Sequence, residues 1–330
     1  MKPIIPFALL GALLAVGAAD AAVTDPVGYV SLGDTTTGQP AIKANTDVYF
    51  SIPLDRPTVF AGAVASVSGS TINLSGTPAL GDLTTVPHVV RITGGPSEGA
   101  TVLINANTAT SATVTVPTGQ SIAGATSISI HLAWTVGTVM GTAFPSGTQL
   151  FTLPSSSAFN PAAEGVYEWD GTNWIDTVNT GAPADADVLF QSETLIVRNV
   201  SASPVASFVI TGEVPTINSS AVISGAPGGT DNAVSFQSPV DEPIGTSGLS
   251  AIANPGDQVF GFDNGSPGLN KAGAFILEWD GADWIDTVNT GAPDNTFPLG
   301  GGRGFIFRRA SVGAPADVIW SNEPNYVPGL

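Results

Sequence analysis

The chain has 330 residues, of which only 11% are charged, and 27 acidic residues face nine basic ones to give a net charge of −18. Soluble proteins carry about 25% charged residues, so Ser, Thr, Asn and Gly must supply most of the polar surface. The acidity argues against a nucleic-acid partner, because phosphate binding needs clustered Lys and Arg. The absence of cysteine excludes disulfides, thiol nucleophiles and zinc–thiolate sites.

The N-terminus has the layout of a secretory signal peptide. Lys2 precedes an apolar run at residues 4–16, and small residues follow up to Ala21, which predicts cleavage after Ala21. The apolar run is shorter than the roughly 20 residues that a membrane-spanning helix needs. We therefore expect no membrane insertion and a secreted protein, extracellular or at the cell surface of a Gram-negative-type bacterium.

Residues 58–135 carry a series of strand-like runs. AGAVASV, TINL, HVVRI, ATVLI, SATVTV and SISIHL follow one another, separated by turn sequences such as SGS and TGGPSEG. Alternation of apolar and polar residues in several runs indicates strands with one buried face. Spacing of this kind is typical of a sandwich or barrel, so this segment predicts a meander closed into a small β-domain.

The rest of the chain contains an internal repeat. EWDGTNWIDTVNTGAP at 168–183 returns as EWDGADWIDTVNTGAP at 278–293, with two differences in sixteen residues. Gly147–Phe151 also matches Gly256–Phe260, and Leu195–Arg198 matches Phe305–Arg308. These matches predict two copies of one β-unit, and Arg198 and Arg308, at equivalent positions, predict a structural salt bridge in each copy.

A fainter similarity links Val48–Pro53 with Val234–Pro239. It suggests that the first strands pack with the repeats and that the small β-domain is an insertion. The sequence thus predicts an all-β protein with a small β-barrel or meander domain and two duplicated β-sandwich-like units. The expected segments are a signal peptide at 1–21, N-terminal strands at 22–57, the small β-domain at 58–135, the first repeat unit at 136–218 and the second at 219–330.

The duplicated segment predicts a hairpin. Asp170-Gly171 indicates a tight turn, which places Trp174 opposite or diagonal to Trp169. The tryptophans either lock the hairpin from inside or form an exposed platform for sugar rings, with Asp and Asn side chains binding hydroxyls. The candidate ligand-binding residues are Trp169, Trp174, Asp176, Asn179, Trp279, Trp284, Asp286 and Asn289.

Turn geometry accounts for the repeated WDG and GAP better than for the repeated DTVN, which is where a binding role would be sought. A third interpretation is a calcium site. It would use Asp170, Asp176, Asp185 and Asp187, although the loop spacing typical of calcium sites is absent.

The sequence contains few residues that could act in catalysis. His88 and His131 are the only histidines and lie far apart in predicted strands, so both are expected to be structural rather than part of a triad or metal site. Glu168 and Glu278 each adjoin a tryptophan on a strand and are expected to face solvent instead of forming a glycosidase carboxylate pair. We predict no catalytic residue, no metal and no cofactor.

Five short motifs carry a resemblance to a known family. They are TDPVGYVSL, INANTAT, AWTVGTVM, YEWDG-x-x-W and GFIFRR. In this order they resemble a paralogous family of exported proteins of unknown function from Verrucomicrobia and related bacteria. The resemblance implies export and membership of a surface or extracellular repertoire, and it supplies no activity or catalytic residue.

These observations predict an exported, non-enzymatic structural or adhesive protein of the cell surface or of an extracellular assembly. The alternative is a carbohydrate-binding protein that uses the repeated Trp hairpins. The expected partners are further copies of the chain or a surface polysaccharide, and not nucleic acid.

Overall fold

The computed structural model describes residues 26–32, 39–154, 159–310 and 316–327, so the predicted signal peptide lies outside the described residues. Strands hold 44% of the described residues and helices 4%, which confirms the all-β prediction. The single α-helix of the described part, α1 (Val136–Met140), has five residues. None of the described helices is long and apolar enough to cross a bilayer.

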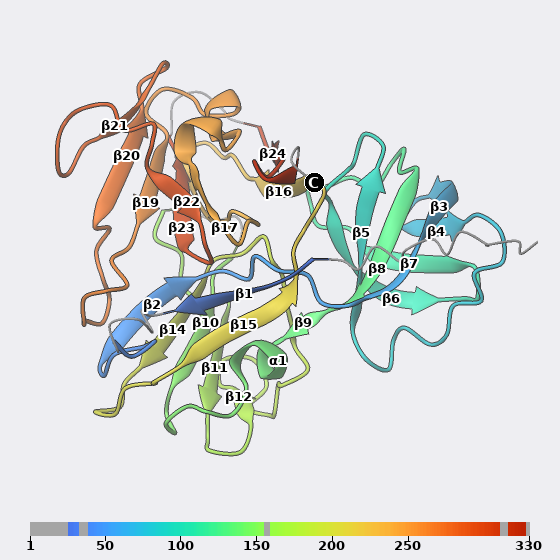
Figure 1. Cartoon of the computed structure of the whole chain (residues 1–330), viewed down its shortest axis with the longest axis horizontal. Helices are drawn as coiled ribbons and strands as arrows, with labels where there is room; N and C mark the ends of the chain where they lie inside the picture. The colour runs from blue at the N-terminus through green and yellow to red at the C-terminus, as the bar shows by residue number, and fades with distance from the viewer. Residues whose placement is uncertain (1–25, 33–38, 155–158, 311–315, 328–330) are drawn as a thin grey trace, which may run out of the picture.

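Six strands close into a barrel, drawn in cyan and blue at the right of Figure 1. Its core holds alternate strand residues such as Ile72, Val102 and Ile130, all buried. All six strands lie where the sequence predicts them, but a simple meander is wrong: β4 pairs with β7 instead of β5, and β3 closes on β8. The strands are β3 (Thr58–Ser68), β4 (Thr71–Leu74), β5 (His88–Gly94), β6 (Thr101–Asn107), β7 (Ser111–Thr115) and β8 (Ser127–Leu132).

The first unit is built on a five-stranded antiparallel sheet of order β12-β11-β10-β14-β2. A ribbon of β1 and β15 covers one side of it, and β9 pairs with β13. The bounds are β1 (Val27–Leu32), β2 (Thr46–Phe50), β9 (Trp134–Thr135), β10 (Gln149–Thr152), β11 (Gly165–Trp169), β12 (Trp174–Asp176), β13 (Val188–Leu189), β14 (Leu195–Asn199) and β15 (Phe208–Glu213).

The second unit has the same plan. Its sheet order is β21-β20-β19-β23-β17, with β16 paired to β24 and β18 paired to β22. Two single-turn 3₁₀ helices, η1 (Ile244–Thr246) and η2 (Leu249–Ala251), lie in the chain where the first unit has α1. The bounds are β16 (Ser219–Ile223), β17 (Thr230–Ser235), β18 (Asp241–Pro243), β19 (Gln258–Gly261), β20 (Phe275–Trp279), β21 (Trp284–Asp286), β22 (Pro298–Gly300), β23 (Gly304–Arg309) and β24 (Val318–Asn322).

The barrel interrupts only the first unit. It occupies the chain between β2 and β9, whereas the corresponding strands β17 and β18 of the second unit follow one another directly. The register of β2 and β17 differs from the sequence match. Asp47 lies opposite Arg198, and Asp231 lies opposite Arg308, so Asp47 corresponds to Asp231, two residues away from the alignment of Val48 with Val234.

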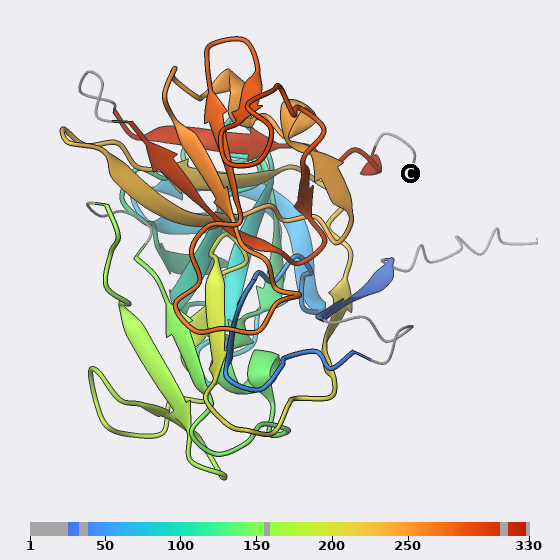
Figure 2. The same cartoon turned by 90° about the vertical axis from the view of Figure 1, so that its left-hand side faces the viewer.

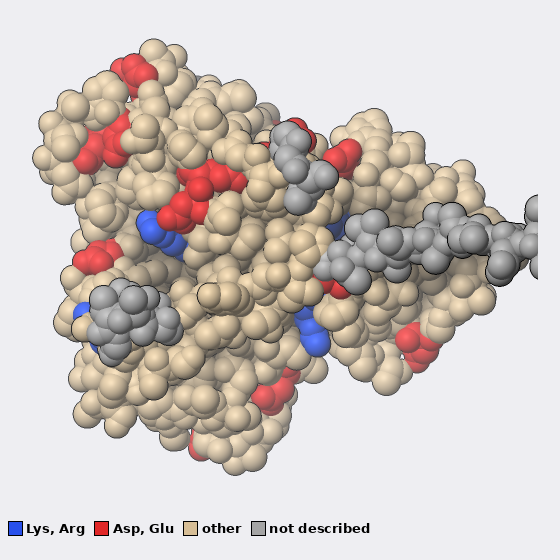
Figure 3. Space-filling model, in the orientation of Figure 1, with Lys and Arg blue, Asp and Glu red and all other residues tan. Residues whose placement is uncertain are grey.

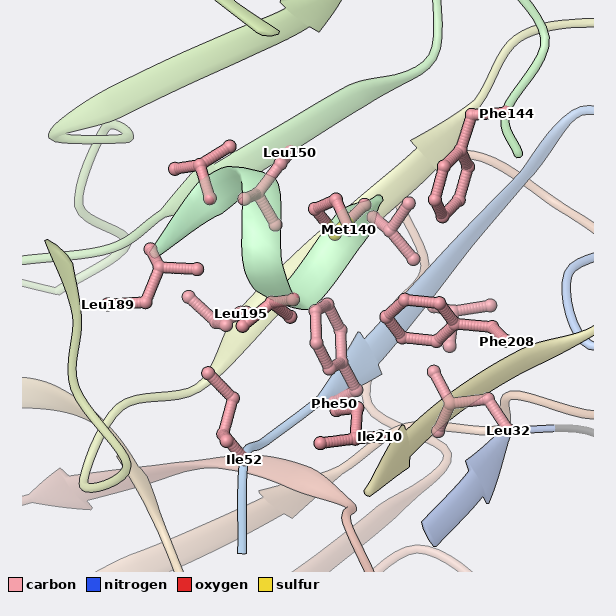
Figure 4. Packing of buried hydrophobic residues seen from close by; sticks show 14 of the residues in the cluster. Leu32, Phe50, Ile52, Met140, Phe144, Leu150, Leu189, Leu195, Phe208 and Ile210 are labelled. Atoms are coloured by element: carbon pink, nitrogen blue, oxygen red, sulfur yellow. The ribbon is translucent and has the colours of Figure 1, made fainter. Parts of the chain in front are cut away.

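The first unit has a hydrophobic core between its sheet and the β1–β15 ribbon, seen in Figure 4. Phe50 of β2 meets Phe208 of β15 edge to face at 5.3 Å between ring centroids. Phe144 contacts both Phe208 and Trp174 in the same manner. Aromatic side chains therefore join the two layers of the sandwich.

The two units lie side by side, the second above the first in Figures 1 and 2, with the barrel beside both. The two units are also joined by backbone β-bridges. Phe50 of β2 forms an antiparallel bridge with Arg303 of the second unit, and Val234 of β17 forms the equivalent bridge with Glu193 of the first. The two units thus meet in a reciprocal way around an approximate two-fold axis.

Candidate functional site

The repeated tryptophans lie inside the molecule. Trp169 pairs directly with Trp174 across the β11–β12 hairpin, with ring centroids 5.5 Å apart. Trp169 is 3% exposed, and Trp174 and Trp284 are fully buried. Trp279 is partly buried and packs on the core of the second unit. Burial of Trp169, Trp174 and Trp284 argues against the sugar-platform interpretation, because a buried indole has no free face to offer a ligand.

The indole N–H groups are also used within the fold. Nε1 of Trp174 donates to the carbonyl oxygen of Gly141 at 2.9 Å. Nε1 of Trp284 donates to the hydroxyl of Ser250 at 3.0 Å. Each tryptophan therefore fixes its hairpin to the segment of its own unit that follows β9 or β18.

The repeated DTVN has a structural reason. The carboxylate of Asp176 is buried and accepts hydrogen bonds from the backbone N–H groups of Val178, Asn179 and Thr180 at 3.1, 3.0 and 3.2 Å. The bond from Asn179 is the main reason that the pKa of Asp176 lies below its usual range. In the second copy Asp286 accepts from the backbone N–H groups of Val288 and Asn289 at 3.1 and 3.0 Å, and its pKa is likewise lowered, chiefly by the bond from Asn289.

These two aspartates therefore organise the loops that follow them. In the part of the chain that the structure describes, no three His, Asp or Glu side chains converge as a metal site would require. Each loop then turns back onto its hairpin, where Pro183 bridges Ile175 and Pro293 bridges Ile285.

Between these fixed points lie the two most exposed parts of the repeat, residues 177–183 and 287–293, which we call the tip loops. Both read TVNTGAP, and every residue in both is exposed. Val178 is 57% exposed and Val288 51%. Asn179 and Asn289, two of the predicted binding residues, lie in the tip loops, whereas the predicted tryptophans and aspartates lie beneath them.

A second arrangement, missed by the sequence interpretation, joins the two units. The predicted salt bridges of Arg198 and Arg308 are confirmed. Arg198 binds the buried carboxylate of Asp47 through two N–H groups at 2.7 and 2.8 Å. Asn270 of the second unit reaches across to this pair: its backbone N–H donates to Asp47, and its side-chain oxygen accepts from Arg198.

The equivalent pair in the second unit is bound by the first unit. Arg308 donates to both oxygens of Asp231 at 2.7 and 2.8 Å. Asn160 donates its backbone N–H to Asp231 at 2.7 Å, and its side-chain oxygen accepts from Arg308 at 3.3 Å. The guanidinium also lies 4.5 Å from the ring of Phe159 and 4.6 Å from that of Phe260.

The recurrence of Asn160 and Asn270, 110 positions apart like the hairpins, was a signal for this contact. Both residues have positive φ, 55° and 52°, a conformation in which Asn is enriched. They form what we call the reciprocal clamps, one on each side of the approximate two-fold axis.

A groove of about 510 Å³ lies beside the reciprocal clamps at the junction of the units. Ile196 of β14 and Ile306 of β23, which are equivalent residues, both line it. Tyr49 stacks flat on Phe262 across the junction, with centroids 3.5 Å apart. The volume is in the range of small-molecule sites. The polar lining includes Asn160, Asn270, Lys271, Asp231 and Arg308.

Lys271 is the least neutralised cation of the groove. Its ammonium donates to the backbone oxygen of Asp263 at 2.7 Å, which leaves two of its three donors for other partners. Desolvation by burial lowers the pKa of Lys271. The groove therefore combines an apolar floor with hydrogen-bonding groups of both kinds. Comparisons of the chain with protein-family models, with curated proteins and with solved structures find no match.

Proposed function

We propose that this chain is an exported, non-enzymatic structural or adhesive protein that acts at the cell surface or in an extracellular assembly. The observation that carries the proposal is the pair of tip loops. They have the same sequence, all of their residues are exposed, and a buried aspartate accepts backbone hydrogen bonds from each loop in equivalent positions.

The exposed valines are the informative part of the tip loops. A turn needs particular backbone angles at Gly181 and Gly291, but it places no demand on an outward-facing side chain. Val178 and Val288 are more than half exposed, so they contribute little to the core. Two identical apolar tips on otherwise polar loops are suited to contacting a partner.

The placement of the loops favours bridging. β12 and β21, which lead into them, lie at opposite ends of the paired units in Figures 1 and 2. One chain can thus engage two copies of the same partner, and two linked weak contacts give an avidity far above either contact alone. Most of the face shown in Figure 3 is uncharged, with acidic and a few basic groups scattered over it, which supports contacts of low charge density.

The partner that we propose is a further copy of the chain or a surface polysaccharide. The groove between the units favours the polysaccharide as a second candidate, since amide, carboxylate and guanidinium groups surround its apolar floor. Carbohydrate binding is thereby proposed for the groove and no longer for the tryptophans.

The test uses the mature protein with Val178→Ser, Val288→Ser and both together. Val86→Ser, at a barrel position that is 50% exposed, serves as the matched control. We expect the wild type and the control to form assemblies in sedimentation velocity, or to agglutinate cells of the source strain. Each single variant should bind without bridging, and the double variant should do neither. Assembly or agglutination unchanged in the double variant would contradict the role of the tip loops.

A further inference from the structure

A second cavity, of about 190 Å³, lies between the barrel and the end of β15 with the chain that follows it. Its floor is the outer face of the barrel strands β3, β8 and β5, and its wall includes the end of β15. It is lined by several buried ionisable groups. Arg91, Asp55 and His131 are each less than 9% exposed. Buried charged groups of this kind are costly unless paired, and they often mark functional sites.

Ser129 and His131 lie two residues apart on β8, so their side chains share its outer face. The Ser129 hydroxyl oxygen is 2.7 Å from Nε2 of His131. Nδ1 of the same ring is 2.9 Å from the carbonyl oxygen of Arg56. A carbonyl oxygen can only accept, so Nδ1 carries the proton and Nε2 is the acceptor for Ser129. The imidazole is thus held in the tautomer that a general base needs.

A carboxylate stands behind the imidazole. The nearer oxygen of Glu213, on β15, is 3.9 Å from Nδ1 of His131. Thr58 fixes that carboxylate, because its hydroxyl donates to Glu213 at 2.9 Å and its backbone N–H also donates to it. The Thr58 hydroxyl oxygen is 3.3 Å from Nδ1. Glu213 is therefore placed to stabilise a positive charge on His131.

The cavity also holds a positive group next to the serine. Arg91 is the cross-strand neighbour of Ser129. One guanidinium N–H group pairs with Asp55 and another with Gln237, while Nε has no partner among the described residues. A buried donor without an acceptor is costly, and a guanidinium beside the reacting carbon can stabilise a negative oxygen.

We propose that Ser129, His131 and Glu213 form a hydrolytic site for small esters, with Ser129 as nucleophile, His131 as general base and Glu213 as the residue that positions and stabilises the imidazole. The proposal goes beyond the adhesive role and departs from the expectation that His131 is only structural. It replaces the non-enzymatic part of the proposed function, because the same chain would then carry a hydrolytic activity beside its adhesive role. The small volume of the cavity restricts the acyl group to a short one.

Ester hydrolysis at this site would proceed in two steps, acylation of Ser129 and hydrolysis of the acyl-enzyme. Ser129 Oγ bonds to the acyl carbon while its proton moves to Nε2 of His131. The bond from that carbon to the alcohol oxygen breaks as His131 returns the proton to the leaving oxygen. Water then repeats the same proton transfers, releases the carboxylic acid and restores the serine, so ester and water give acid and alcohol.

The experiment uses the mature protein, p-nitrophenyl acetate as substrate and a fluorophosphonate as covalent probe. We expect turnover, and labelling at Ser129 located by peptide mass spectrometry. Ser129→Ala, which removes only a hydroxyl group, should abolish both. His131→Gln should lower the rate at least 100-fold, the scale of general-base catalysis. Glu213→Gln keeps an acceptor for Thr58 but loses the charge, and should lower kcat more than it changes KM.

Two matched controls come from the same barrel. His88 is buried, and its Nδ1 likewise faces two backbone carbonyls, those of Leu83 and Val86. Ser127 lies on β8 two residues before Ser129. His88→Gln and Ser127→Ala should keep the full rate. If Ser129→Ala hydrolyses the ester as fast as the wild type, or if the probe labels another residue, the proposal is overturned. Agglutination is measured on the same Ser129→Ala variant. It tests the tip loops separately, because it does not depend on hydrolysis.

Discussion

Asn160 and Asn270 occupy equivalent places in the two units, and each binds the buried aspartate of the opposite unit through its backbone N–H. Each also accepts a hydrogen bond from the arginine paired with that aspartate. The interface between the units therefore depends on the same contact made twice in opposite directions.

We expect Asn160→Ala and Asn270→Ala each to lower the free energy of unfolding by about 1–2 kcal/mol. The change removes an acceptor for an arginine and places an alanine at positive φ. Asn→Gly at the same sites keeps the backbone N–H and relieves the strain, so it should cost less. Urea unfolding of the single and double variants measures both effects. Equal losses for Ala and Gly would show that backbone conformation plays no part.

Burial of the hairpin tryptophans predicts a large stability cost when they are truncated. Trp174→Ala and Trp284→Ala each empty a fully buried site and should destabilise the fold by about 3–5 kcal/mol. Trp279 is only partly buried, so Trp279→Ala should cost less than Trp169→Ala at the equivalent position. Chemical denaturation provides the comparison, and acrylamide should quench the native fluorescence only weakly. A larger loss for Trp279→Ala would contradict the structure.

Glu193 predicts a pH dependence. It lies at the bridge to Val234 between the units, and desolvation by burial raises its pKa from 4.5 to about 7. The folded state then holds a proton that the unfolded state has lost, so its contribution to stability falls as the pH rises from about 4.5 to about 7. Glu193→Gln should match the wild type at pH 4 and be more stable at pH 8. Thermal unfolding at both values tests this, and a variant less stable at pH 8 would reverse the sign.

Arg91 ties the barrel to both units. It pairs with Asp55, between β2 and β3, and donates to Gln237 of the second unit, while Gln191 of the first unit also donates to Asp55. Arg91→Met leaves the buried carboxylate of Asp55 without its cationic partner and should cost about 3–5 kcal/mol.

The double variant Asp55→Asn with Arg91→Met should recover part of that loss, because no charge is left alone. Denaturation of Arg91→Met, of Asp55→Asn alone and of the double variant gives the coupling, and limited proteolysis shows whether the barrel is released. Strictly additive losses would exclude the pairing as the source of the effect.

Much of the fold could be predicted from local sequence. The six barrel strands follow from alternating apolar residues and glycine-rich turns, and the paired tryptophans follow from Asp170-Gly171. The order of the barrel strands could not be predicted. β4 pairs with β7, which lies far along the chain, and no local sequence pattern indicates that pairing. The salt bridges of Arg198 and Arg308 were predicted, but their asparagine partners come from the opposite unit.

The candidate sites could also be predicted only in part. The internal repeat indicated the Trp hairpins, but sequence periodicity cannot distinguish an indole ring that faces a ligand from one that faces the core. Ser129, His131 and Glu213 carry no motif. Two lie in the barrel and the third in β15, and only closure of the barrel against the first unit brings them together.

The interface between the units has an implication for ancestry. An interface in which equivalent residues of the two units make the same contact in opposite directions is self-complementary, as in a symmetric homodimer. A chain holding a single unit could have assembled with an identical molecule through the same surface. Fusion would then have freed one half to accept an extra domain while its counterpart kept the shorter connection between β17 and β18.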